Sequence, residues 1–121
     1  MSNVILVLDS STEILLLLKK VLGSKGKIHT VEDGASAVHF LSTHVLPAVI
    51  VINPKIEVLD GYNLLDYLKS SKIYNHIPTI LLSDQSEKYL QELSEEFSCA
   101  AYFKKPFDPL SLLNTIDAIL N

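Results

Sequence analysis

Polar and charged side chains stand directly after the short apolar runs of this 121-residue chain. Asp9 and Ser10 follow VILVL, Asn53 follows VIVI, Ser83 ends TILLS, and Lys105 comes shortly after AYF. If these runs are neighbouring strands of one parallel sheet, their carboxyl ends meet at the same edge. A carboxylate, an amide, a hydroxyl and an ammonium group would then lie together. Such a set can form a buried ion pair or contact a charged ligand.

Five apolar runs alternate with five amphipathic segments along the chain. The strands are expected at 4–8, 27–31, 48–53, 79–83 and 101–103, and the helices at 12–24, from 33–34 onward, 62–70, 86–97 and 108–120. Strands that alternate with helices through short connections predict a parallel sheet covered on both faces. At this length we expect a flavodoxin-like α/β fold, a three-layer (βα)5 sandwich with strand order 2-1-3-4-5.

Helix-start signals refine this expectation at three places. Ser10 is expected to cap the first helix, because Glu13 three residues later completes a capping box. Asp84 is expected to cap the fourth helix. In the last helix Asp108 is the expected N-cap and Pro109 the first helical residue.

The peptide bond between Lys105 and Pro106 is expected to be trans from the statistics of X–Pro bonds alone.

The first helix carries an expected buried stripe at i, i+3, i+4, i+7 and i+8, which comprises Ile14, Leu17, Leu18, Val21 and Leu22. Leu16 points away from this stripe, so we expect it to be exposed. Together with its neighbour Leu15, and with Leu110 on the last helix, it is a candidate surface for binding a partner protein.

Composition excludes several classes of protein. The chain is 48% hydrophobic with net charge −4, and all ten of its basic residues are Lys, so it lacks the basic, Arg-containing stripe of a nucleic-acid binder. Its longest apolar run is too short to span a membrane, and its first residues do not resemble a secretion signal. The single Cys99 is interpreted as a small buried hydrophobe, and the four histidines as surface or core-edge residues without ligand spacing. We therefore expect one cytoplasmic domain over residues 1–121.

In this order and spacing, the motifs resemble the receiver (CheY-like) domain of bacterial response regulators over the whole chain. The matching positions are Asp9 after ILVLD, Asp60-Gly61 seven residues beyond Asn53, Ser83 after IPTILLS, and the run YFKKPF at 102–107. In that family, three carboxylates hold Mg²⁺ and one of them accepts a phosphoryl group from a histidine kinase. A Ser/Thr and a Lys, here Ser83 and Lys105, contact the phosphate. The resemblance implies that Tyr102 is the switch aromatic, the side chain that changes between an inward and an outward pose. It also implies a cis bond between Lys105 and Pro106, which is usual in the family.

The chain departs from this family where the chemistry takes place. Asn53 stands at the phosphoacceptor position, and an amide cannot form the acyl phosphate. Ser10 replaces a principal Mg²⁺ ligand, while Lys55 and Glu57 stand in the loop after the third strand. One carboxylate (Asp9) then faces one ammonium (Lys105), so little charge is left to dehydrate Mg²⁺. We expect no catalysis, no metal and no cofactor, and we expect Lys55 or Lys105 to pair with Asp9.

Three functions remain open. The leading one is a degenerate pseudo-receiver, a phosphorylation-independent interaction module of two-component phosphorelay signalling. Its partner would be a histidine kinase, a phosphotransfer protein or an output domain, and the chain would be a monomer or weak homodimer. The second is an active receiver whose acceptor was replaced by Asn53. The third is a small anion or cofactor binder that uses the hydroxyls at Ser10–Thr12. The degenerate phosphorylation pocket is expected to comprise Asp9, Ser10, Asn53, Lys55, Ser83, Asp84 and Lys105.

Overall fold

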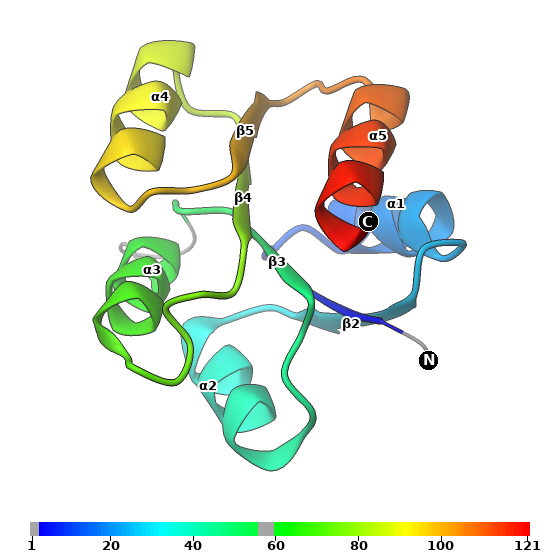
Figure 1. The fold of residues 1–121 in the computed structure, drawn as a ribbon. Helices are drawn as coiled ribbons and strands as arrows, with labels where there is room; N and C mark the ends of the chain where they lie inside the picture. The colour runs from blue at the N-terminus through cyan, green and yellow to red at the C-terminus, as the bar shows by residue number, and fades with distance from the viewer. Residues whose placement is uncertain (1–2, 56–59) are drawn as a thin grey trace.

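The computed structural model describes residues 3–55 and 60–121, which form a parallel sheet between two layers of helices (Figure 1). The strands are β1 (Val4–Leu8), β2 (Lys27–Val31), β3 (Val49–Ile52), β4 (Thr79–Ser83) and β5 (Ala101–Lys104), in the order β2-β1-β3-β4-β5. The helices are α1 (Thr12–Leu22), α2 (Gly34–Thr43), α3 (Asp60–Ser70), α4 (Glu87–Glu96) and α5 (Pro109–Leu120). The expected flavodoxin-like fold and its strand order are confirmed.

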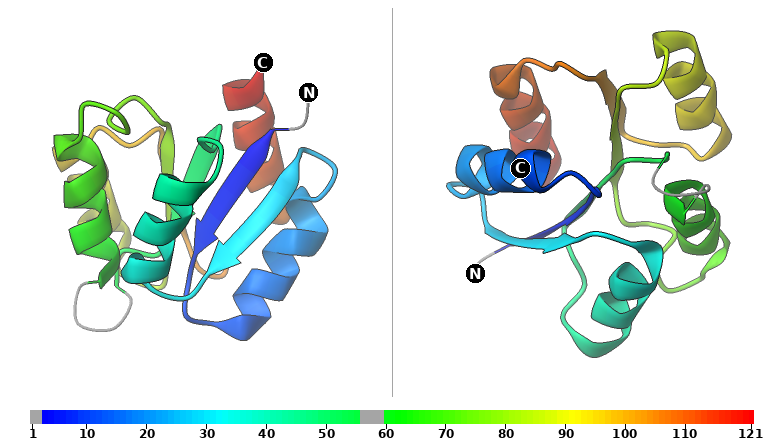
Figure 2. Two further views of the ribbon diagram at one scale, coloured as in Figure 1. Left: turned by 90° about the horizontal axis from the view of Figure 1, so that it is seen from below. Right: turned by 180° about the vertical axis from the view of Figure 1, so that it is seen from behind.

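The two faces of the sheet have separate hydrophobic cores. Helices α1 and α5 cover one face, and α2, α3 and α4 cover the other (Figures 1 and 2). Successive residues of β3 alternate between the two cores: Ile50 and Ile52 pack toward α2, α3 and α4, and Val49 and Val51 toward α1 and α5. Because both faces of the sheet are covered, β1 and β3 are apolar at every position, and β4 is apolar between Thr79 and Ser83 at its two ends.

The expected caps of α1 and α4 are each displaced toward the helix. Ser11, not Ser10, caps α1 by accepting a hydrogen bond from the Ile14 N–H, and Ser86, not Asp84, caps α4. In both loops the strand is followed by a side-chain turn, in which Asp9 accepts from the N–H two residues later and Ser83 does the same. These turns use Asp9 and Ser83 at the ends of the strands, so the caps lie one and two residues later than expected, although α1 begins at Thr12 as expected.

The buried face of α1 is also rotated from the expected stripe. Leu15, Leu18 and Leu22 are buried against the core shared with α5, whereas Leu17 is 39% exposed. Leu15 therefore lies in the core and is not part of an exposed partner surface. Residues 14–18 are all apolar, so the pattern alone fits more than one helix face. Leu16 and Leu110 are 62% and 61% exposed, as expected.

Smaller differences concern the ends of elements. Helix α1 ends at Leu22 where residue 24 was expected, β3 begins at Val49 where residue 48 was expected, and α3 begins at Asp60 where residue 62 was expected. Within residues 3–55 and 60–121, the helices are all too short or too polar to cross a membrane.

Candidate functional site

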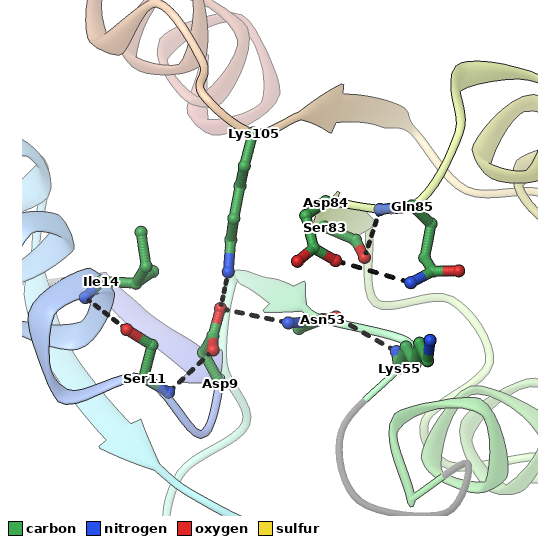
Figure 3. Close-up of polar contacts among 9 residues, drawn as sticks. All are labelled: Asp9, Ser11, Ile14, Asn53, Lys55, Ser83, Asp84, Gln85 and Lys105. Carbon is green, nitrogen blue, oxygen red and sulfur yellow. Dashed lines mark hydrogen bonds and ion pairs between the residues drawn. The ribbon is translucent and has the colours of Figure 1, made fainter.

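Asp9 lies at the end of β1, buried at 2% exposure, and its carboxylate forms an ion pair with Lys105 (Figure 3). The Lys105 Nζ lies 2.7 Å from Asp9 Oδ2, and the two side chains are 17% and 3% exposed. The sequence left open whether Lys55 or Lys105 would pair with Asp9, and the structure places Lys105 there. The Lys105 backbone N–H donates to the Ser83 carbonyl at 2.8 Å. The Lys105–Pro106 bond is cis, as the family resemblance implied, and the trans bond expected from X–Pro statistics alone is wrong.

Asn53 faces Asp9 from the end of the neighbouring strand β3. Its side-chain Nδ2 donates to Asp9 Oδ2 at 3.5 Å, and its Oδ1 accepts the Lys55 backbone N–H at 3.1 Å. These two contacts fix the orientation of the amide, with its donor toward the carboxylate. Lys55 therefore takes part through its backbone, and its side chain is exposed. Glu57 lies outside the described residues.

The carboxylate of Asp9 is thus hydrogen-bonded on both oxygens. Oδ1 accepts the Ser11 backbone N–H at 3.0 Å, and Oδ2 accepts from Lys105 and Asn53. A buried carboxylate is costly unless it is paired and hydrogen-bonded, and here a cation and two amide donors meet that need. Ser10, which the sequence placed in the same pocket, is exposed.

Gly61 allows the start of α3 to lie against the end of β3. A Cβ at this position would overlap the carbonyl oxygen of Asn53 and would lie 2.7 Å from the Pro54 Cα. Both clashes are with backbone, which has little freedom to move. The Asp60-Gly61 pair in the sequence therefore marks a close approach of two backbones beside the site.

The β4–α4 loop borders the site and is held by Lys104. Ser83 is fully buried, and its hydroxyl accepts the Gln85 N–H at 3.2 Å. The Lys104 Nζ donates to the carbonyls of Asp84 and Gln85, at 3.0 and 3.2 Å. Asp84 is exposed. Sequence reasoning missed Lys104; the only signal was its place beside Lys105 at the end of an edge strand.

Tyr102 and Cys99 are not part of the ion-pair cluster, and Cys99 precedes β5, at the opposite end of the sheet from Asp9. Tyr102 is half-buried on β5 and packs against the core on the α2, α3 and α4 face. Cys99 is half-buried against the same core, and burial raises the pKa of its thiol. Both placements agree with roles in packing.

The histidines are less scattered than the sequence suggested. The rings of His29 on β2 and His44 after α2 lie 5.9 Å apart, and each stacks on Phe40. His29 is half-buried and His44 exposed, in agreement with the expected core-edge and surface positions. In the part of the chain that the structure describes, no group of three or more His, Cys, Asp or Glu residues could hold a metal ion.

Comparison with known proteins finds relatives that match almost the whole chain. The alkaline phosphatase synthesis transcriptional regulatory protein PhoP of Bacillus subtilis is 30% identical over 121 residues, which cover 99% of this chain and 49% of PhoP. The chain thus spans about half the length of that relative.

Solved structures agree with the relationship. The receiver domain of a histidine kinase from Syntrophus aciditrophicus is 28% identical, with a TM-score of 0.85 over 98% of this chain and 90% of that one. The BeF3-activated DrrB receiver domain of Thermotoga maritima is 25% identical, with a TM-score of 0.84 over 99% and 98% of the two chains. The family model for the response regulator receiver domain matches residues 5–117, and the chain therefore belongs to the response regulator receiver domain family.

Proposed function

We propose that the chain is a pseudo-receiver, a receiver domain that binds its signalling partners without being phosphorylated. Receiver domains are signalling modules of two-component systems and interact with histidine kinases, phosphotransfer proteins or output domains. The observation that supports the proposal is the arrangement at Asp9, where the Lys105 ammonium and the Asn53 amide both contact Oδ2.

The side chain at the acceptor position is the first argument. Covalent phosphoryl transfer to a receiver needs a carboxylate oxygen as the nucleophile, and Asn53 supplies an amide. The Asn53 nitrogen is engaged with Asp9 and its oxygen with the Lys55 N–H. The amide acts here as a structural link between β1 and the loop after β3.

The fit of Mg²⁺ to these residues is the second argument. Mg²⁺ requires a near-octahedral set of oxygen ligands and usually binds carboxylates. Asp9 directs both oxygens to N–H donors, and Ser10 is exposed where the family has a second carboxylate. The ammonium of Lys105 already provides the positive charge that Asp9 needs. These residues do not fit Mg²⁺.

An anion site at the start of α1 has less support. The Ser11 hydroxyl accepts the Ile14 N–H, and the Ser11 backbone N–H donates to Asp9. Both groups are engaged within the chain, and the Asp9 carboxylate beside them repels anions. The pseudo-receiver is therefore the better interpretation of the same residues.

Phosphorylation by acetyl phosphate tests the proposal directly. The chain is incubated with acetyl phosphate and Mg²⁺, and covalent labelling is read by intact-mass spectrometry. We expect no labelling of the wild type and inefficient labelling of Asn53→Asp, because the metal site still lacks a carboxylate at Ser10. The double variant Ser10→Asp/Asn53→Asp should label more than either single variant. Labelling of the wild type would overturn the proposal, and efficient labelling of Asn53→Asp alone would favour an active receiver with a replaced acceptor.

Partner binding provides a separate test on the α1 surface. Leu16 on α1 is 62% exposed, so its apolar side chain is accessible to a partner, although a single exposed leucine is common in proteins. We propose that it contacts the signalling partner. Leu16→Glu should weaken binding of a cognate histidine kinase or phosphotransfer protein, with or without acetyl phosphate. Lys19→Glu, an exposed change of charge on the same helix, is the matched control, and equal binding by the two variants would remove Leu16 from the interface.

A further inference from the structure

A groove lies at the amino ends of β1 and β2, at the opposite end of these strands from Asp9. It has a volume of about 490 Å³, and its lining includes Lys27, His29, Phe40, Thr43, His44 and Val45. A second hollow of about 380 Å³ shares His29, Phe40 and His44 with it. Sites for small molecules commonly have volumes of about 300–1,000 Å³. Strand β2 forms an edge of the sheet and α2 packs beside it (Figure 1). The residues that line the groove come from these two elements, from the start of β1 and from the residues just after α2.

Three flat rings form the apolar part of this groove. The ring centroid of Phe40 lies 4.2 Å from that of His29 and 4.5 Å from that of His44, and both pairs are stacked. Phe40 is buried at 4% exposure, so it anchors the cluster in the core. Such surfaces bind another aromatic ring by offset or edge-to-face stacking.

Hydrogen bonds within the chain hold the His44 ring in place. Its Nδ1 lies 2.8 Å from the Thr43 Oγ1, and that hydroxyl donates its only proton to the His39 carbonyl at 2.8 Å. The proton between Thr43 and His44 must therefore belong to Nδ1, so we assign His44 as the donor. The His44 backbone N–H also donates to the Phe40 carbonyl at 3.0 Å. A ring fixed in this way loses little freedom when a ligand stacks on it.

The charges around the groove are positive. Lys27 is exposed at its rim, and the described residues that line it include no Asp or Glu. Burial lowers the pKa of His29, and His44, Lys19 and Lys27 lower it further. That electrostatic environment disfavours an added proton on His29 and favours an anion at the same place. In a chain with net charge −4, this is a local exception.

We propose that this groove binds a small planar aromatic carboxylate. The aromatic ring stacks on the accessible parts of His29 and His44, whose rings rest on the buried Phe40, and the carboxylate pairs with the Lys27 ammonium. The site is separate from the Asp9 cluster, so the inference does not depend on whether the chain is phosphorylated.

An NMR titration of the full chain tests this site, with indole-3-acetate as the probe. Saturable shifts of backbone amides are expected at Lys27, His29 and His44, and much smaller ones at Asp9 and Lys105. Indole tests the role of the carboxylate, and cyclohexylacetate tests that of the aromatic ring. Both should bind several-fold more weakly than indole-3-acetate.

Substitutions of exposed residues separate the two contacts without disturbing the core. Lys27→Gln should weaken indole-3-acetate about threefold, the effect of losing one exposed ion pair. His44→Ser should weaken it about fivefold through the lost stacking. Lys20→Gln and His76→Ser, also at exposed positions, are the controls and should bind as the wild type does. Any of three results would overturn the proposal. The first is the absence of saturable shifts up to about 10 mM indole-3-acetate, and the second is equal binding of all three probes. The third is equal binding of indole-3-acetate by Lys27→Gln, His44→Ser and their controls.

Discussion

Replacing Lys105 with Met should destabilise the fold, because it leaves the Asp9 carboxylate buried without its cation. Breaking a fully buried ion pair by removing one partner costs about 3–5 kcal/mol. Two features of this site reduce the cost. Lys105 is 17% exposed, so water reaches the lysine side of the pair, and the Ser11 N–H and the Asn53 amide still donate to Asp9. We therefore expect a loss of about 1–3 kcal/mol in the free energy of unfolding.

Urea unfolding measures this loss. With a slope of about 2 kcal/mol per molar urea, a loss of about 2 kcal/mol lowers the midpoint by about 1 M. Asp9→Asn should also lower the midpoint, since it leaves the Lys105 ammonium without a carboxylate. The double variant Asp9→Asn/Lys105→Met should lose less than the two single losses together, because neither charge is then left unpaired.

A second ion pair of the chain provides the matched control. Lys25 Nζ lies 2.9 Å from Asp117 Oδ1, but these side chains are 27% and 48% exposed. Lys25→Met should therefore cost only about 0–1 kcal/mol. Two results together would refute the reasoning. Lys105→Met would lower the urea midpoint no more than Lys25→Met does, and the double variant would lose as much free energy of unfolding as the two single variants combined.

Three further changes test other parts of the structure. Gly61→Ala should cost about 2 kcal/mol or more in urea unfolding, because its methyl group overlaps the backbone at the end of β3; unchanged stability would contradict the close approach. Ser11→Ala should cost about 1 kcal/mol by removing the α1 cap, whereas Ser10→Ala should change stability by less than about 0.5 kcal/mol, and the reverse order would restore the capping-box prediction. The folded protein holds the pKa of His29 below its ordinary 6.5, so the unfolded chain takes up protons more readily and the free energy of unfolding should fall as the pH drops below about 6.5. His29→Gln should flatten this dependence on pH, whereas the control His76→Gln should not. Equal pH dependence in the two variants would show that His29 is not its source.

The sequence was sufficient to predict the fold because its strongest signals act at the level of whole elements. A strand such as β3, apolar at all four positions, can be buried only in a sheet that is covered on both faces. The alternation with helices then leaves few topologies. The buried face of α1 was predicted correctly at Leu18 and Leu22 but wrongly at Leu17. Residues 14–18 are all apolar, and only packing against α5 and the sheet selects Leu15 over Leu17.

The candidate site was predictable in its members but not in its bonds. The carboxyl ends of parallel strands bring Asp9, Asn53 and Lys105 together whatever the side-chain rotamers are. Which lysine pairs with Asp9 depends on rotamers and loop paths, and Lys55 turns out to contribute its backbone N–H. The stacking of His29 and His44 on Phe40 joins two different elements, so no spacing within one segment could reveal it.

The electrostatics of Asp9 connect the fold to the proposed function. A carboxylate at the end of a buried strand needs a positive partner, and the nature of that partner decides whether the site can change state. A bound cation or a phosphoryl group can leave, whereas Lys105 is part of the chain and is held by a backbone hydrogen bond to Ser83. Lys104 acts in the same direction, since it ties the β4–α4 loop to the end of β5. Two adjacent lysines thus join the end of β5 to Asp9 and to the β4–α4 loop, and it is on these contacts that the proposal of a single-state receiver rests.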